Sequence, residues 1–214
     1  MSEFLTPDSA ARLVRHGQVV AFPTETFYGL AALPMDHDAL LTLAELKGRD
    51  AGKPIGLIIS DAAVLSELAI DIAPELLDLC EHCWPGPLTV VFPAVELDAI
   101  ITGGSGTVAV RVPSSEHARE LTRLSGGAVT ATSANKQGAP PPCTAAAVRE
   151  AFAAELRLGT LAGISGGWNT PGHLPSTIVT RSDRALRVLR TGAVSIEELR
   201  RWWRGPILTD KDAR

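Results

Sequence analysis

The nine residues Phe-Pro-Thr-Glu-Thr-Phe-Tyr-Gly-Leu, at positions 22–30, follow a short apolar run that begins at Gln18. The run predicts a buried strand, and we expect Pro23 to leave its ladder because proline has no N–H to donate. Two hydroxyls, a carboxylate and a phenol then follow directly. Sheets of α/β proteins present ligand-binding groups at their strand ends, so this stretch is our starting point for a site. An ordinary polar turn is the alternative.

Strands and helices alternate along the rest of the chain, which predicts a three-layer α/β domain with helices on both faces of the sheet. Closely spaced late strands indicate that the sheet is mixed. We expect strands at 18–22, 56–59, 88–92, 108–112, 128–132, 161–164, 176–180 and 185–189. We expect helices from Thr6 to Gly17, at 36–47, after Ser60-Asp61, at 74–84, from about 116, after Thr144 and at 195–203. No linker divides the chain, so residues 1–214 are expected to form one domain.

Composition narrows the class of protein. The chain has 214 residues, of which 45% are hydrophobic and 21% charged, as in a folded globular protein. A net charge of −4 argues against coating nucleic acid by bulk charge, although a local basic site is allowed. The N-terminus has no secretory pattern, and no apolar run approaches the ~20 residues that span a bilayer. With three cysteines, these features predict a cytoplasmic protein.

Cations cluster on the loop after the second predicted helix, as Lys47, Arg49 and Lys53. The functional interpretation is a clamp for phosphate or carboxylate, and the alternative is a solvated helix cap. The loop is not a nucleotide-binding P-loop, since its glycine spacing is wrong and Pro54 stands where that motif has Ser or Thr.

Four further strand ends carry polar groups. Residues 130–135, Thr-Ala-Thr-Ser-Ala-Asn, form either a polar turn or a ligand contact. Arg111 on an apolar strand requires either a structural carboxylate or an anionic ligand, and Arg190 and Ser176 pose the same choice. By contrast, Cys80 and Cys83 form a single C-x-x-C pair on a helix, which cannot complete a zinc site alone. We therefore predict no metal site.

The order and spacing of these motifs resemble the YrdC-type family of L-threonylcarbamoyladenylate synthases from about Pro7 to Trp203. The matching motifs are Pro-Thr-Glu-Thr-x-Tyr-Gly-Leu after the first strand, Lys47-x-Arg49, Trp84-Pro-Gly-Pro-Leu-Thr89, Val108-Ala-Val-Arg111, Ser133-x-Asn135, Pro175-Ser-Thr-Ile178 and Leu189-Arg-x-Gly192. The resemblance implies an open, twisted mixed sheet with a concave, positively charged site. It also implies a nucleotidyltransferase that joins L-threonine, bicarbonate or CO₂ and ATP, with Mg²⁺, into threonylcarbamoyl-AMP and pyrophosphate. The product would feed threonylcarbamoylation of adenosine 37 in tRNA through a separate transferase.

The resemblance also assigns residues to that site. The catalytic pair would be Lys47 and Arg49. The ATP-binding residues would be Lys47, Arg49, Lys53, Thr107, Ser133, Asn135 and Arg190. The threonine-binding residues would be Thr24, Thr26, Tyr28, Arg111, Ala131 and Ser176.

Two departures accompany this resemblance. Phe27 replaces the commoner Val, and Ile58 stands where longer relatives place a histidine near threonine. We also expect the chain to lack the extra C-terminal domain of those longer relatives, so it resembles the short bacterial form, with a core of about 7–203 and a tail of 204–214. Two other interpretations remain. One is a domain that makes a carbamoyl-adenylate, and the other is an RNA-binding or ribosome-assembly factor that uses the same basic concave surface.

Overall fold

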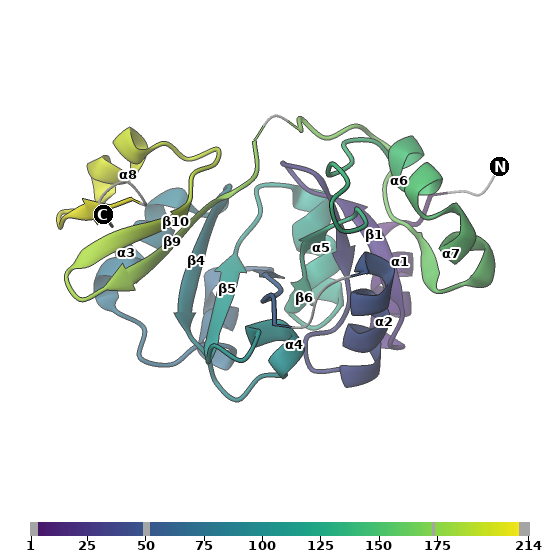
Figure 1. The fold of residues 1–214 in the computed structure, drawn as a ribbon, viewed down its shortest axis with the longest axis horizontal. Coiled ribbons are helices and arrows are strands. Elements are labelled where there is room, and N and C mark those ends of the chain that lie inside the picture. The colour runs from purple at the N-terminus through teal and green to yellow at the C-terminus, as the bar shows by residue number, and fades with distance from the viewer. Residues whose placement is uncertain (1–3, 49–51, 173, 210–214) are drawn as a thin grey trace.

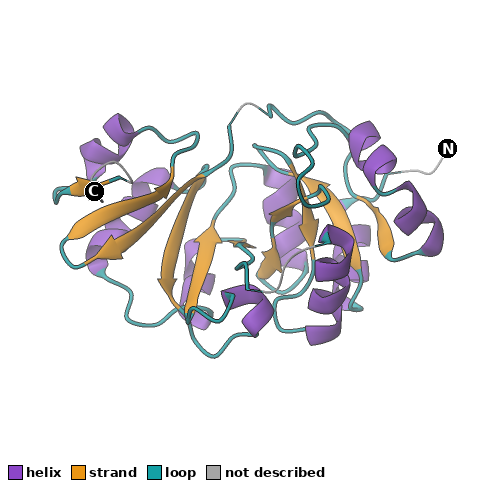
Figure 2. Ribbon diagram, in the orientation of Figure 1, coloured by secondary structure: helices purple, strands orange, loops and turns teal. Residues whose placement is uncertain are grey.

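The computed structural model describes residues 4–48, 52–172 and 174–209. Figure 1 shows two groups of elements side by side, one around β9, β10, β4 and β5 and the other around β1 and the helices α1 and α2. Figure 2 shows strands in the middle of both groups and helices around them. The predicted mixed α/β class is confirmed, although the strands belong to two hydrogen-bonded sheets where we expect one.

The smaller sheet has the order β7-β2-β1-β8 and contains the stretch from which the prediction starts. Its strands are β1 Val19–Pro23, β2 Tyr28–Ala31, β7 Thr132–Ser133 and β8 Leu161–Ile164. β1 and β2 form an antiparallel hairpin, β7 is antiparallel to β2, and β8 is parallel to β1. Pro23 does not leave the sheet as expected. It is the last residue of β1, opposite Tyr28, because a terminal strand residue needs no N–H in the ladder.

The larger sheet has the order β11-β10-β9-β4-β5-β3-β6 and mixes parallel with antiparallel pairs. Its strands are β3 Leu57–Ile59, β4 Leu88–Pro93, β5 Thr107–Arg111, β6 Ala128–Thr130, β9 Thr177–Ser182, β10 Ala185–Arg190 and β11 Ile207–Leu208. Of these, only β11 falls where the sequence predicts no strand.

The helices are α1 Pro7–Arg15, α2 His37–Lys47, α3 Pro74–Cys83, α4 Ala99–Thr102, α5 Glu116–Leu124, α6 Ala145–Ala151, α7 Ala153–Leu158 and α8 Ile196–Trp202. Thr6 caps α1 and Ser195 forms the predicted capping box of α8. The segment after Asp61 is a short 3₁₀ helix, η1 (Ala62–Glu67), and the Ala-rich helix is interrupted at Phe152. No helix among the described residues is long and apolar enough to span a bilayer.

Strand β1 is buried along its whole length because helices cover both faces of its sheet. Val20 and Phe22 pack into the cluster that includes Ala10 of α1 and Leu121 of α5. Val19 and Ala21 alternate to the other face and join the main core, which includes leucines of α2. The continuous apolar run thus follows from burial on both sides.

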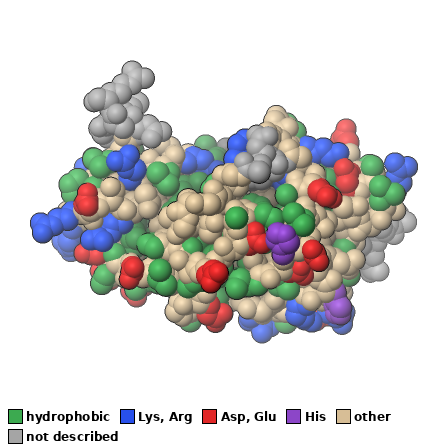
Figure 3. All heavy atoms as spheres, turned by 60° about the horizontal axis from the view of Figure 1, so that its bottom comes forward, with side chains coloured by type: hydrophobic (Ala, Val, Ile, Leu, Met, Phe, Trp, Pro, Cys, Tyr) green, Lys and Arg blue, Asp and Glu red, His purple; other side chains and the backbone are tan. Residues whose placement is uncertain are grey.

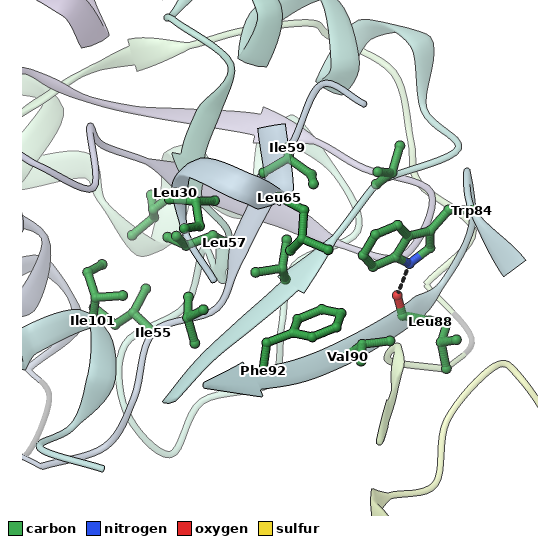
Figure 4. Close-up of a cluster of buried hydrophobic side chains, with 14 of the residues drawn as sticks. Leu30, Ile55, Leu57, Ile59, Leu65, Trp84, Leu88, Val90, Phe92 and Ile101 are labelled. Atoms are coloured by element: carbon green, nitrogen blue, oxygen red, sulfur yellow. Dashed lines mark hydrogen bonds between the residues drawn. The ribbon is translucent and has the colours of Figure 1, made fainter. Parts of the chain in front are cut away.

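The main core continues beneath the larger sheet. Figure 4 shows Leu57 and Ile59 of β3 and Leu88, Val90 and Phe92 of β4 with Leu65 of η1 and Trp84. The Trp84 indole N–H donates to the Leu88 carbonyl at 2.7 Å, which satisfies its only polar group. This packing supports the strands that carry residues of the site described below.

The two sheets meet where the chain passes from β6 to β7. The predicted strand 128–132 is broken at Ala131, because residues 128–130 pair with β3 and residues 132–133 pair with β2. The buried Thr130 hydroxyl donates to the Leu30 carbonyl and accepts from the Ala32 N–H, both at 2.9 Å. One side chain of the larger sheet therefore bonds to the backbone of the smaller one.

Acid should destabilise this fold through His117 of α5. Its Nε2 lies 2.7 Å from the Ser165 hydroxyl oxygen, and burial lowers its pKa to about 4. Because an unfolded histidine has a pKa of about 6.5, the unfolded chain binds this proton first as the pH falls. The stabilisation is therefore complete above about pH 6.5 and is lost progressively toward pH 4.

We expect His117→Gln to lose less stability than wild type between pH 7 and pH 5 in urea unfolding. Exposed His16→Gln is the control, and equal losses in wild type and His117→Gln would contradict the assignment.

Candidate active site

A cavity of about 500 Å³ lies between the two sheets and takes its lining from both. The smaller sheet contributes the β1–β2 loop and the segment around β7, and the larger sheet contributes β3, β4, β5, β9 and β10. Eight of the predicted site residues line it, namely Thr24, Thr26, Lys47, Arg111, Ala131, Ser133, Ser176 and Arg190. Segments up to 166 positions apart in the chain thus share one site.

The β1–β2 loop is held by the side chain of its first residue. The Thr24 hydroxyl donates to the Phe27 carbonyl at 2.8 Å and accepts from the Thr26 N–H at 3.1 Å. The Thr24 and Thr26 hydroxyl oxygens lie 3.0 Å apart. Gly29 follows on the cavity wall, where a Cβ would lie 3.1 Å from the Phe22 ring. Residues 24–29 therefore form a turn and also part of the cavity wall.

Lys47 is the last residue of α2 and is buried beside the 133–135 segment. Its Nζ donates to the Ser133 carbonyl at 2.6 Å and to the Asn135 carbonyl at 2.7 Å, with the Asn135 amide oxygen at 3.3 Å. Gly48 ends the helix in the left-handed conformation that glycine adopts without strain. Lys47, the described member of the predicted Lys-x-Arg pair, is hence in direct contact with the Ser133-x-Asn135 pair.

Arg111 is the last residue of β5 and is almost fully buried on the cavity wall. Its Nη1 forms an ion pair with the Glu25 carboxylate, which comes from the opposite sheet. Burial and the neighbouring Arg190 lower the pKa of Arg111 to about 10, so the side chain keeps its charge at neutral pH. The sequence allowed two partners for Arg111, a structural carboxylate or an anionic ligand. The structure contains the carboxylate, that of Glu25.

Arg190 ends β10 and approaches the same cavity from the other side. Its guanidinium donates to the Ser176 carbonyl at 2.8 Å and to the Ser176 hydroxyl at 2.9 Å. That hydroxyl oxygen lies 2.8 Å from the hydroxyl oxygen of Thr89 on β4. These partners are neutral oxygens, so they hold the Arg190 side chain without cancelling its charge.

The other predicted residues do not line the cavity. Tyr28 is fully buried and donates its hydroxyl to the Trp168 carbonyl at 2.7 Å, and burial raises its pKa to about 12. Asn135 is half-buried, and its amide donates to the Ala139 carbonyl at 2.7 Å. Lys53 is exposed beside the cavity residue Pro54. Arg49 lies outside the described residues.

Thr107 begins β5, four residues before Arg111, and also lies outside the cavity lining. Alternate residues of a strand share a face, so Thr107, Ala109 and Arg111 point to the same side of the sheet. Ala109 lines the cavity, and Thr107 continues its surface along the strand.

Two residues of the site were missed by sequence reasoning. Glu25 pairs with Arg111, and Thr89 lies beside Ser176 on the cavity wall. A signal for Glu25 was present, because a buried guanidinium requires a counter-ion and Glu25 lies in the stretch already assigned to the site.

The Cys80-x-x-Cys83 pair lies on α3, away from this cavity. Cys80 is buried, and burial raises the pKa of both thiols, that of Cys83 to about 11. Such thiols are poor nucleophiles and metal ligands at neutral pH because the thiolate is the reactive form. Among the described residues, no group of three or more His, Cys, Asp or Glu side chains could hold a metal ion.

Comparison with known proteins identifies the family. Residues 12–192 match the family model Sua5/YciO/YrdC, described as "Telomere recombination". The chain is 40% identical over 191 residues to the threonylcarbamoyl-AMP synthase of Pyrococcus abyssi. This alignment covers 89% of this chain and 55% of that protein. It is 38% identical over 205 residues to the Bacillus subtilis protein of the same name, covering 94% and 57%. The chain belongs to the Sua5/YciO/YrdC family, and it spans little more than half the length of these two relatives.

Solved structures agree with that assignment. The Pyrococcus abyssi Sua5 structure complexed with L-threonine matches with a TM-score of 0.87 and 38% identity, covering 94% of this chain and 58% of that one. Escherichia coli YciO matches with a TM-score of 0.77 at 21% identity, covering 93% and 100%, which supports the fold alone.

We expect Gly192→Ala to disturb the Arg190 side of the cavity. A Cβ at this position would lie 2.3 Å from the Pro175 carbonyl oxygen and 2.6 Å from that of Ser176, which are both backbone atoms. The segment must therefore move away from Ser176, at a cost of roughly 1–3 kcal/mol. Thermal unfolding should show this loss, and the neighbouring exposed substitution Thr191→Ala should not. A Gly192→Ala protein as stable as wild type would refute the close approach.

Proposed function

We propose that this chain is a threonylcarbamoyl-AMP synthase, which joins L-threonine, bicarbonate or CO₂ and ATP into L-threonylcarbamoyladenylate and pyrophosphate. The observation that supports the proposal is the position and hydrogen bonding of the Arg111 side chain. Its guanidinium lines the cavity, and among the described residues its hydrogen bonding is limited to one nitrogen held by Glu25. The remaining N–H groups can form the planar fork that binds a carboxylate.

The hydroxyls near Arg111 suit the rest of the amino acid. Thr24, Thr26, Thr89 and Ser176 line the same cavity and can donate or accept hydrogen bonds. A site that bonds the substrate hydroxyl would reject an analogue without it strongly, because buried polar groups would then lack partners. The name of the Pyrococcus abyssi complex supports threonine as that amino acid.

The reaction requires two bonds to form in turn. The neutral threonine amine attacks CO₂ and releases a proton to give a carbamate, and a carbamate oxygen then attacks the α-phosphorus of ATP as pyrophosphate leaves. Positioning and charge neutralisation supply most of the rate in such phosphoryl transfers. We assign Lys47 and Arg190 to the nucleotide, Lys47 because it holds the Ser133 and Asn135 backbone in place. Arg49, Lys53 and Thr107 stay in this assignment as sequence-based proposals.

Magnesium would enter this site as part of the substrate MgATP. The described residues supply no carboxylate cluster at the cavity, and Glu25 is already paired with Arg111. The triphosphate would therefore hold the ion, and the cationic side chains would neutralise the leaving pyrophosphate. We expect the product to be consumed in the cytoplasm by a transferase that modifies adenosine 37 of tRNA.

The RNA-binding alternative has less support. The relatives that cover most of this chain are named as synthases. Hydroxyl groups and the arginines Arg111 and Arg190 line the cavity, and Phe27 is its only aromatic lining residue among those described. Sequence-tolerant binding of single-stranded RNA uses several aromatic side chains on which successive bases stack.

Pyrophosphate release tests the proposed function. Purified protein with MgATP and bicarbonate should release pyrophosphate when L-threonine is added, less with L-serine, which lacks the methyl group, and far less with L-valine, which lacks the hydroxyl, or with no amino acid. Arg111→Lys keeps the charge but loses the fork, so it should raise the threonine KM about tenfold or more. Exposed Arg12→Lys is the matched control. Release that is independent of threonine, or absent from the folded protein, would refute the synthase.

A further inference from the structure

The Arg111 end of the cavity holds two cations and one anion. The side chains of Arg111 and Glu25 are only 8% and 15% exposed, so their pairing is shielded from water and salt. Arg190 is near enough to depress the pKa of Arg111, and its own hydrogen bonds go to the neutral oxygens of Ser176. With Glu25 present, the net charge at this end is about +1.

Glu25 does not touch the cavity. It is not among the lining residues, although Thr24 and Thr26 on either side of it are. Its Oε1 accepts from Arg111 Nη1, whereas its Oε2 is buried with no hydrogen-bond partner among the described residues. The pair is therefore monodentate. Any effect of Glu25 on a ligand must pass through the orientation and charge of Arg111.

The loop geometry fixes where that carboxylate can lie. The Thr24 hydroxyl bonds the backbone of both Thr26 and Phe27, so residue 25 sits at the tip of a closed turn. Holding Nη1 from this tip leaves the other edge of the Arg111 guanidinium for a ligand in the cavity.

We infer that Glu25 is a positioning residue that makes this end of the cavity selective for a single carboxylate. It turns the free edge of Arg111 toward the ligand, and it cancels one of the two guanidinium charges. A net charge of about +1 matches the carboxylate of an amino acid, whereas +2 would favour a phosphate dianion. The inference deepens the proposed function and rests on it for the identity of the amino acid.

Two variants separate charge from position. Glu25→Gln keeps the shape but removes the charge, so inorganic phosphate should bind at least about threefold more tightly. The neutral amide oxygen also holds Arg111 Nη1 less firmly than a carboxylate does, so the guanidinium loses its orientation and the threonine KM should rise about tenfold. Glu25→Asp keeps the charge but shortens the reach by one carbon. It should raise the threonine KM while phosphate affinity stays at the wild-type value. Phosphate affinity is measured by calorimetry on the protein without other ligands, and the threonine KM by pyrophosphate release.

The control is Glu120→Gln, which removes an exposed carboxylate that pairs with Arg123 outside the cavity. Thermal unfolding checks that each variant is folded. An unchanged threonine KM in both Glu25 variants would overturn the inference while the synthase stands. A raised KM in Glu25→Gln with unchanged phosphate affinity would overturn the charge selection. If wild type releases no pyrophosphate, the proposed function fails, and the phosphate affinities of wild type, Glu25→Gln and Glu25→Asp still decide whether Glu25 sets the charge.

Discussion

The ion pair between Glu25 and Arg111 is the contact on which the site depends. Glu25 belongs to the hairpin loop of the smaller sheet and Arg111 to the end of β5 in the larger one, so the pair joins both walls of the cavity. Removing one partner of a buried pair typically costs about 3–5 kcal/mol, because the other charge is left without compensation. The pair thus ties the geometry of the cavity to the stability of the fold.

The junction of the sheets gives this pair its setting. At Ala131 the chain crosses from β6 to β7, and the Thr130 hydroxyl donates to the Leu30 carbonyl and accepts from the Ala32 N–H. Helices α1 and α5 cover one face of the smaller sheet, and α2 packs toward the other and delivers Lys47 to the 133–135 segment. The cavity lies between the two sheets, so well-packed strands and helices hold its lining residues in place.

Much of this architecture could be predicted from local patterns. Helix caps such as Thr6 and Ser195 are local signals, and the apolar run before Pro23 identifies a strand buried on both faces. The pattern does not say which strand pairs with which. For that reason the sequence did not predict that the strand 128–132 divides at Ala131 between two sheets. It also did not predict β2, because this fully buried strand begins within the polar motif.

The sequence predicted which residues belong to the site better than it predicted how these residues are arranged. Residue types that need a partner, such as Arg111, point to a site, but the partner comes from a loop 86 positions away. Tyr28 belongs to the same motif as Thr24 and Thr26, yet strand alternation turns its ring into the core. Only tertiary packing decides which side of a strand meets the cavity.

A crystal structure of this protein with L-threonine and a non-hydrolysable ATP analogue would test the central claim most directly. The account predicts threonine between the two sheets, with its carboxylate on the edge of Arg111 that Glu25 leaves free and the triphosphate toward Lys47. Threonine bound elsewhere, or a carboxylate that displaces Glu25 from Arg111, would contradict it.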